Sequence, residues 1–239
     1  MNEMKLSKRL ETVANYIPNN AIFADIGSDH AYLPCFSILQ GKAKAAIVGE
    51  ITEGPFLSAE KQVMKNELSE VVSVRKGDGL SVIKEGEVLD CITIAGMGGS
   101  LIRKILEEGN SKLMNVNRLI LQPNIHANFL RQWLIDHEWE LIDESIIEED
   151  NKVYEILVAE KGDALRPYQS DSFQASLLLG PFLARKKSGV FMKKWAEECK
   201  HWKTILAQLE QAGHTYDNNE KYRELITKIK LVEEVLQSS

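Results

Sequence analysis

Residues 24–34 of the chain read ADIGSDHAYLP and come directly after the apolar residues AIF. An apolar run that ends in an acid and a glycine is typical of a buried strand leading into a ligand-binding turn. Turns that bind a pyrophosphate are rich in glycine, whereas this one contains Asp29, His30 and Tyr32. The stretch therefore predicts a ligand that leaves room for side chains and brings no diphosphate against the backbone.

Four more short apolar runs alternate with stretches of helical character. They occupy residues 45–50, 71–78, 91–96 and 118–123. Runs this apolar suit strands covered on both faces, and the alternation with helices predicts a parallel sheet built from βα units. The carboxyl ends of such strands form the ligand crevice of an open α/β sheet.

A helix and an antiparallel strand pair are expected after the fifth run. Residues 128–138 have helical character, and the strand-like stretches 139–149 and 152–160 are joined by the turn-like Asp150 and Asn151. We therefore expect an α/β fold with a Rossmann-like parallel sheet closed by a β-hairpin. A symmetrical dinucleotide-binding sheet would continue with further βα units.

The last part of the chain has the spacing of paired helices. Two series of apolar residues recur every three or four positions, which predicts an antiparallel helical hairpin from about Val190 to Gln237. Asp217 and Glu220 are placed to cap its second helix. Because residues 162–170 are turn-rich, we expect a ligand-binding domain at 1–162 and a helical, coiled-coil-like domain at 163–239. The two series are Trp195, Cys199, Trp202, Leu206 and Leu209, then Tyr222, Leu225, Ile229, Val232 and Leu236.

The composition is that of an ordinary globular chain of the cytoplasm. The 239 residues are 44% hydrophobic and 27% charged. No stretch approaches ~18 uninterrupted apolar residues, so no membrane segment is expected, and the charged N-terminus is unlike a signal peptide. The three cysteines are odd in number and far apart, which predicts neither a disulfide framework nor a zinc site. Neither a metal nor an obligate protein partner is expected.

Charge is unevenly distributed along the chain, although the net charge is −6. Residues 131–160 contain ten acids and two bases, whereas residues 161–203 contain nine bases and four acids. A local excess of five positive charges, nine minus four, attracts a phosphate backbone. A solvated helix face is the alternative interpretation. The RNA-binding candidates are Lys186, Lys187, Lys193 and Lys194.

Acids end three successive strands, namely Asp25, Glu50 and Asp78. Carboxylates accept hydrogen bonds from ribose hydroxyls, an ammonium group and an adenine amine, and they repel a pyrophosphate. S-adenosylmethionine offers all three groups and a sulfonium without any phosphate, so we expect it as the cofactor. Glu50 suits the ribose diol and Asp78 the adenine amine, while Gly27 and Gly79 lie at the turns beside them. The alternative for each acid is to cap a helix.

Two further strand ends supply site candidates. Residues 94–99 read IAGMGG, an open bend in which Ala95, Gly96 and Met97 are candidates for cofactor binding. Met97 packs on a base or fills a gap in the core. Asn124, after the fifth run, offers a donor and an acceptor to a base edge, or it caps the following helix.

Five motifs follow one another along the chain: ADIGSDHAYLP, GEITEGPFLSA, GDGL, ITIAGMGG and LILQPNIH. In this order they resemble the bacterial tRNA adenine-N1-methyltransferases that act at position 22. The resemblance implies a class I methyltransferase domain that binds S-adenosylmethionine, a coiled-coil-like C-terminal domain and methyl transfer to N1 of adenine 22 in tRNA. Asp29 and Ala31 depart from the second and third glycines of the usual methyltransferase loop, D-x-G-x-G-x-G.

The chemistry of N1 methylation suggests roles for the first turn. The unprotonated N1 lone pair attacks the methyl group in line, so the enzyme mainly has to align the reactants. Because the product is cationic, a carboxylate beside the base would stabilise it, and Asp29 is the first candidate. His30, Tyr32 and Asn124 are candidates for positioning. Tyr32 either stacks on the extruded base or is partly buried in the fold.

Three other functions fit parts of the sequence. A nicotinamide-dependent dehydrogenase shares the sheet but requires a G-x-G-x-x-G turn, where this chain has Asp29. A class I methyltransferase acting on a small molecule would use the helical hairpin as a dimerisation arm, and the basic residues 161–203 argue against it. An RNA-binding scaffold would not need acids at three strand ends. Methylation of tRNA is therefore the expected function.

Overall fold

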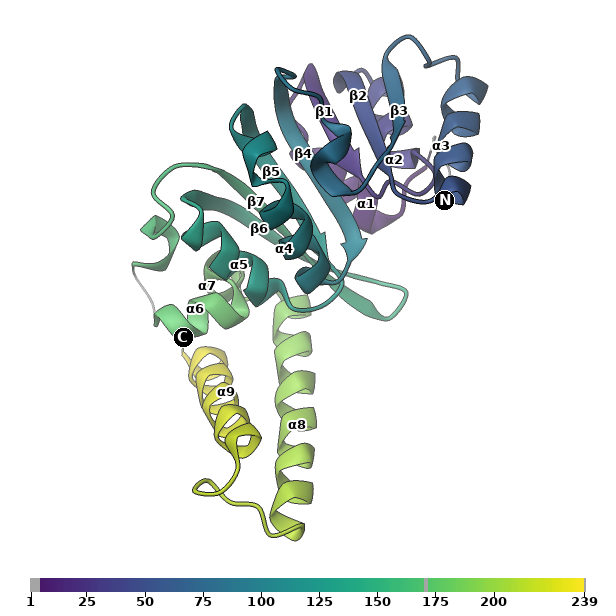
Figure 1. The fold of residues 1–239 in the computed structure, drawn as a ribbon. Coiled ribbons are helices and arrows are strands. Elements are labelled where there is room, and N and C mark those ends of the chain that lie inside the picture. The colour runs from purple at the N-terminus through teal and green to yellow at the C-terminus, as the bar shows by residue number, and fades with distance from the viewer. Residues whose placement is uncertain (1–4, 170–171, 239) are drawn as a thin grey trace. The chain divides into compact units, whose positions relative to one another are not determined.

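A parallel sheet forms the centre of the first part of the chain. The computed structural model describes residues 5–169 and 172–238, and the chain divides into two compact units, Met1–Arg166 and Pro167–Ser239. The first unit contains a seven-stranded sheet in the order β3-β2-β1-β4-β5-β7-β6 (Figure 1). Strands β1 to β5 are parallel and β6 and β7 antiparallel, so the predicted sheet closed by a hairpin is confirmed. The strands are β1 (Ala21–Ile26), β2 (Ala43–Glu50), β3 (Val72–Lys76), β4 (Leu89–Met97), β5 (Val116–Pro123), β6 (Trp139–Glu149) and β7 (Lys152–Lys161).

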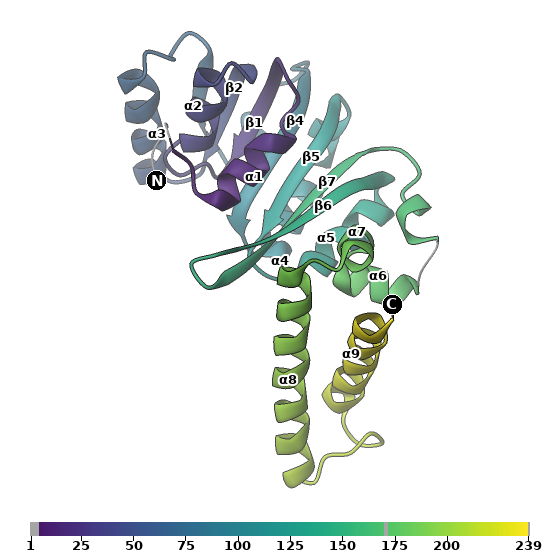
Figure 2. The ribbon, with the colours of Figure 1, turned by 180° about the vertical axis from the view of Figure 1, so that it is seen from behind.

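Helices cover both faces of this sheet. Figures 1 and 2 show α4 and α5 over one face and α1 and α2 over the opposite face. Val13 of α1, Leu33 of α2 and Val63 of α3 join one core cluster with Phe23 of β1. The connection from β3 to β4 contains only a short 3-10 turn, η1. These elements are α1 (Lys8–Tyr16), α2 (Tyr32–Leu39), α3 (Glu53–Lys65), η1 (Gly79–Val82), α4 (Gly99–Glu108), η2 (Asn110–Leu113) and α5 (Ala127–Asp136).

The β-hairpin is fixed at two points. Asp150 and Asn151 form its turn with φ values of 50° and 58°, the left-handed conformation that a two-residue hairpin loop favours. At the other point, Arg131 of α5 is fully buried, and its Nη2 lies 2.6 Å from Glu144 Oε1 of β6 and 2.5 Å from Glu155 Oε2 of β7. This buried ion triad selects one register, because a slip of one residue would turn a glutamate to the opposite face of the sheet.

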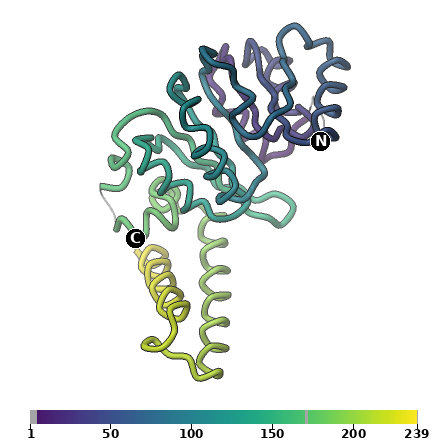
Figure 3. The backbone as a smooth tube through the Cα atoms, in the orientation of Figure 1, coloured from purple at the N-terminus to yellow at the C-terminus, as the bar shows by residue number. Residues whose placement is uncertain are grey.

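The second unit contains the helical hairpin. Helices α8 and α9 lie side by side and are joined by a loop (Figure 3). The predicted apolar series supply the buried faces, with Trp195 and Cys199 from α8 and Leu225, Ile229 and Val232 from α9. Across both described ranges, no helix has the combination of length and apolar residues that crossing a bilayer requires. The elements of this unit are α6 (Phe173–Leu179), α7 (Pro181–Lys186), α8 (Gly189–Gln211) and α9 (Glu220–Gln237), and η3 (Arg166–Tyr168) begins one residue before it.

The second helix of the hairpin begins with a different cap from the one predicted. Asn219 Oδ1 accepts the Tyr222 N–H at 3.0 Å, so Asn219 is the N-cap of α9. The predicted capping pair of Asp217 and Glu220 is therefore wrong. The Asp217 carbonyl instead accepts a hydrogen bond from Arg223 Nη1 at 3.3 Å, which holds the loop before the helix.

Candidate active site

A cavity of about 190 Å³ lies at the carboxyl edge of the sheet. The strand pairing explains its position, because Asp25 of β1 lies opposite Thr93 of β4 and both strands end a few residues later. The cavity brings together seven of the predicted site residues and adds Arg9 from α1. The seven are Asp25, Gly27, Asp29, His30, Tyr32, Ala95 and Gly96.

In the loop after β1, every second residue has a left-handed backbone conformation. Gly27, Asp29 and Ala31 have φ values of 71°, 64° and 52°. Such values are uncommon for residues other than glycine, so this loop is strained at Asp29 and Ala31. A Cβ on Gly27 would lie 2.0 Å from Met97 Cε, which means that Met97 packs against the loop at the glycine. Met97 therefore helps to shape the loop, and a side chain at position 27 would displace the end of Met97 and strain the backbone.

Asp25 is a buried acid whose carboxylate is held by two hydroxyl groups. Only 3% of the residue is exposed. Ser28 Oγ donates to Oδ2 at 2.5 Å and Thr93 Oγ1 donates to Oδ1 at 2.6 Å. Burial raises the pKa of the Asp25 carboxyl, while the two hydrogen bonds and the charge of Arg9 oppose the shift.

Glu50 joins the loops that follow β1 and β3. Its carboxylate accepts the Asp29 N–H at 2.5 Å, and its carbonyl accepts the Gly77 N–H at 2.8 Å. Burial raises the pKa of Glu50; the hydrogen bond from Asp29 opposes this shift, and the negative charges of Asp25 and Asp29 add to it. The side chain thus sits beside the cavity with one of its acceptor positions already used by the protein.

Asp29, His30 and Tyr32 form the more exposed part of the site. The Asp29 side chain is 70% exposed, and its Oδ2 lies 3.6 Å from His30 Nε2. His30 Nδ1 lies 2.5 Å from Ser58 Oγ of α3, which orients the imidazole ring. The rings of His30 and Tyr32 are stacked, with centroids 5.2 Å apart. The carboxylate, imidazole and phenol are therefore neighbours and line the same cavity.

The loops after β4 and β5 are bound to each other. Asn124 Nδ2 donates to the Gly96 carbonyl at 2.8 Å, and the Asn124 N–H donates to the Met97 carbonyl at 2.7 Å. Gln122 is fully buried, and its Oε1 accepts the Gly96 N–H at 3.0 Å and Arg9 Nη1 at 2.5 Å. Gly96 was a candidate for cofactor binding, and its N–H is already used by Gln122. Asn124 holds the bend that lines the cavity.

Asp78 and Gly79 lie in a separate cavity. This space of about 210 Å³ is also lined by Ile105 and Glu108 of α4. Asp78 is exposed and immediately precedes η1, and Gly79 has a φ of 51°. Gly77, which precedes Asp78, donates its N–H to the carbonyl of Glu50 at the end of β2.

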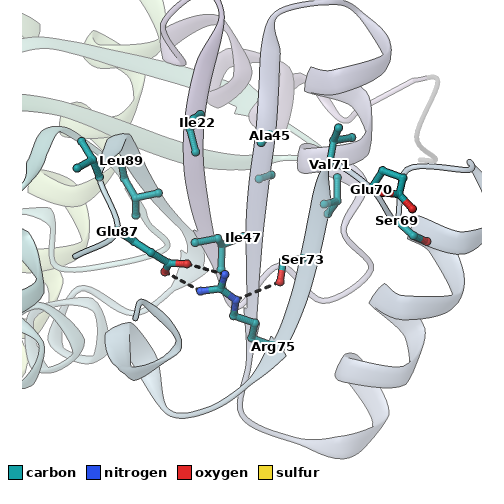
Figure 4. Close-up of a pocket in the computed structure, with 13 residues that line it drawn as sticks. Ile22, Ala45, Ile47, Ser69, Glu70, Val71, Ser73, Arg75, Glu87 and Leu89 are labelled. Carbon is teal, nitrogen blue, oxygen red and sulfur yellow. Dashed lines mark hydrogen bonds and ion pairs between the residues drawn. The ribbon is translucent and has the colours of Figure 1, made fainter. Parts of the chain in front are cut away.

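A third cavity, of about 300 Å³, lies away from these residues (Figure 4). It is lined by Ile22 of β1, by the middle of β2 with Ile47, and by Leu89 at the start of β4. Arg75 and Glu87 form a paired ion bridge there, with Nη1–Oε2 2.7 Å and Nη2–Oε1 2.8 Å. These charges neutralise each other, and none of the predicted site residues lines this cavity.

A methyltransferase family matches most of the chain. The model of the family described as tRNA (adenine(22)-N(1))-methyltransferase, TrmK, covers residues 23–234. The chain belongs to this family. A tRNA (adenine(22)-N(1))-methyltransferase of Bacillus subtilis (strain 168) is 58% identical to it over 236 residues, which cover 99% of both chains. The family predicted from the five motifs is thereby confirmed.

Solved structures of TrmK-family proteins share the fold. The B. subtilis m1A22 tRNA methyltransferase TrmK has a TM-score of 0.92 at 55% identity and covers 98% of this chain and 100% of its own. A putative tRNA (m1A22) methyltransferase of Streptococcus pneumoniae, in complex with S-adenosyl-L-methionine, has a TM-score of 0.86 at 44% identity, with coverage of 98% and 100%. The Rossmann-like class of the fold is confirmed by these structures.

The basic candidates lie in the second unit of this TrmK-family chain. Lys187 is engaged within the unit, because its Nζ donates to the carbonyl and to the Oγ of Ser238 after α9, the latter at 2.9 Å. Lys194 Nζ lies 4.7 Å from the centre of the Trp195 ring. Lys186 and Lys193 are exposed. Of the four lysines, Lys187 thus connects the end of α7 to the residue after α9. The other three carry their charges on α7 and α8.

Sequence reasoning missed several residues of this site. Arg9, Gln122, Ser58 and Thr93 contact the predicted residues through side-chain hydrogen bonds or line the same cavity. Thr93 lies within a strand that the sequence predicted. Its position opposite Asp25 in the neighbouring strand was the signal that could have identified it as a site residue. The other three contacts join distant segments and have no local pattern.

Proposed function

We propose that this chain transfers the methyl group of S-adenosylmethionine to N1 of adenine 22 in tRNA. The observation that carries the proposal is the cavity at the ends of β1 and β4, where Asp25, Asp29 and Arg9 lie together. Membership of the tRNA (adenine(22)-N(1))-methyltransferase family supplies the reaction and the substrate class.

The charges around the cavity suit S-adenosylmethionine better than a dinucleotide. Asp25 and Glu50 provide acceptors for an ammonium group and ribose hydroxyls, and Arg9 provides a donor for a carboxylate. A pyrophosphate at the same place would meet the carboxylates of Asp25 and Asp29. When bound, the cofactor supplies a methyl group on a positively charged sulfur. Asp78 in the neighbouring cavity stays our candidate for the adenine amine.

The exposed residues of the cavity are assigned to the target adenine. Asp29 places a solvent-reaching carboxylate where positive charge develops on the methylated base, which stabilises the product side of the reaction. Ser58 orients His30, and the stacked His30 and Tyr32 rings limit the positions that an extruded base can take. Alignment by such contacts provides most of the rate enhancement, because N1 needs no strong base.

The second unit is assigned to tRNA binding. Lys186, Lys193 and Lys194 carry positive charge on α7 and α8, and phosphate contacts of this kind supply sequence-independent affinity for RNA. We place the reaction in the cytoplasm, where tRNA is processed.

The proposal is tested by methylation of an unmodified tRNA transcript. We expect one methyl group per tRNA, mapped to N1 of adenine 22 by nucleoside mass spectrometry after fragmentation. A transcript with guanine at position 22 is the matched control and should take up no methyl group. A protein that binds S-adenosylhomocysteine but leaves the transcript unmodified would contradict the proposal and favour a small-molecule substrate.

A further inference from the structure

The loop after β5 carries an exposed aromatic pair. His126 is exposed, Phe129 is 39% exposed, and Ile125 between Asn124 and the pair is 60% exposed. The rings of His126 and Phe129 are stacked, with centroids 5.1 Å apart and an angle of 28° between their planes. Two planar rings of this kind present flat surface to solvent beside an apolar side chain.

The backbone under this pair is strained and firmly held. His126 has a φ of 61°, a left-handed conformation that is costly for a residue other than glycine. The Gly99 N–H donates to the Ile125 carbonyl at 2.9 Å, and the Phe129 N–H donates to the His126 carbonyl at 3.1 Å. A Cβ on Gly99 would lie 2.3 Å from the His126 carbonyl oxygen, so glycine is needed for the two loops to meet. Strain that persists under such support is a feature of functional loops.

The same loop is attached to the candidate active site. Asn124, two residues before His126, donates from its side chain to the Gly96 carbonyl at 2.8 Å. Gly96 lines the cavity that contains Asp25 and Asp29. The aromatic pair therefore lies at the carboxyl edge of the sheet, on a loop that is hydrogen-bonded to the wall of the cavity.

We propose that His126 and Phe129 form a stacking platform for a tRNA base next to the target adenine. The proposal rests on the proposed function, because a target adenine must leave its own stack before N1 is accessible. Its neighbours in the RNA then lose a stacking partner, and exposed aromatic rings replace that partner for any base. His30 and Tyr32 serve the target base itself, and the pair on the β5 loop serves the adjoining nucleotide.

The test compares substitutions at Phe129 by steady-state kinetics with tRNA. Phe129→Ala should raise the KM for tRNA about five- to hundredfold, the range found for loss of one base–aromatic stack, with a smaller change in kcat. Phe129→Trp should restore a KM close to that of the wild type, whereas Phe129→Leu should not, because leucine keeps apolar bulk without a ring face. His126→Asn tolerates the left-handed backbone and removes the ring, so it should raise KM as well.

Two controls separate the platform from a structural role. Affinity for S-adenosylhomocysteine and the melting temperature should stay at wild-type values in all four variants. Met114→Ala, at a residue that is 81% exposed before β5, should leave the KM for tRNA unchanged.

Three results would overturn the proposal. The first is a wild-type KM in both Phe129→Ala and His126→Asn, and the second is full rescue by Phe129→Leu. The third is an equal loss of cofactor affinity, which would make the pair part of the fold. A wild-type protein that methylates no tRNA would instead refute the proposed function. The stacking proposal would then be refuted as well, because it depends on that function.

Discussion

Replacing Glu50 by glutamine tests whether one carboxylate holds the β1 loop and also binds the ribose of the cofactor. Glu50 is 5% exposed and accepts the Asp29 N–H at 2.5 Å. A hydrogen bond that involves a charged group contributes ~1.5–3 kcal/mol, and one between neutral groups ~0.5–1.5 kcal/mol. Glutamine keeps an acceptor of the same shape, so each bond made by this side chain should weaken by about 1 kcal/mol.

The bond to Asp29 is present before the cofactor binds, so it cancels from the binding free energy. Two bonds to the ribose diol remain, and their weakening amounts to about 2 kcal/mol, or roughly thirtyfold in the dissociation constant. Glu50→Ala removes these bonds altogether and also leaves the Asp29 N–H without its acceptor. That variant should bind more weakly still and unfold at a lower temperature.

Isothermal titration calorimetry with S-adenosylhomocysteine measures both variants against Glu85→Gln, a substitution at an exposed residue of the β3–β4 connection. The control should bind like the wild type. If Glu50→Gln binds within threefold of the wild type while its melting temperature is unchanged, Glu50 does not hold the ribose. If Glu50→Ala keeps its melting temperature, the side chain does not support the loop.

Three further results are expected. Asp29→Ala should lower the single-turnover methylation rate at least tenfold with unchanged affinity for S-adenosylhomocysteine, because its carboxylate reaches solvent rather than the core; a parallel loss of both would make Asp29 a cofactor ligand. Replacing Lys186, Lys193 and Lys194 with glutamate should weaken tRNA binding and flatten its salt dependence in filter-binding assays, and unchanged affinity and slope would leave these residues as a solvated face. Burial raises the pKa of Asp25, so its stabilising contribution is present below the ordinary carboxyl pKa and is lost as the pH rises through the raised value. Asp25→Asn should therefore increase the free energy of unfolding, measured with urea, more at pH 8 than at pH 4, and equal changes would contradict this assignment.

The sheet was predictable because its signal is local. Each parallel strand is a run of five to nine residues, and the buried centres of β1, β2, β4 and β5 show as mostly apolar sequence. The hairpin followed from two longer strand-like stretches joined by Asp150 and Asn151. The predicted residues of the first cavity were also mostly local, since Asp25, Gly27 and Asp29 occupy one turn.

The missing parts of the site depend on contacts that form only when distant segments pack. Arg9 and Gln122 are separated by 113 positions, and their hydrogen bond requires α1 to lie against the end of β5. Periodicity identifies the buried face of α1 but does not say which polar side chain reaches the cavity. Asp78 was predicted from a local pattern, the acids that end successive strands, and it does follow β3 in the structure. The pattern did not predict that Asp78 lines a different cavity from Asp25.

The wrong helix cap has a similar cause. Asp217 and Asn219 are both good capping residues, and the choice between them depends on the loop. Asn218 Oδ1 accepts the Thr215 N–H at 2.8 Å, and Arg223 Nη1 donates to the carbonyl of Asp217. These bonds keep the chain in a turn as far as Asn218, so α9 begins after Asn219.

The triad of Arg131, Glu144 and Glu155 constrains how this sequence can change over generations. Arg131 carries one positive charge against two carboxylates, so losing one glutamate leaves a balanced pair, whereas losing Arg131, or a second member after the first, leaves a buried charge uncompensated. That state costs ~3–5 kcal/mol, a large part of the ~5–15 kcal/mol that stabilises a typical protein. Exchanging all three for apolar residues of similar volume is often neutral or stabilising. Each single-step route to that apolar core therefore passes through a poorly folded ancestor. A chain that contains the triad therefore cannot exchange it for an apolar core by single substitutions that are each neutral.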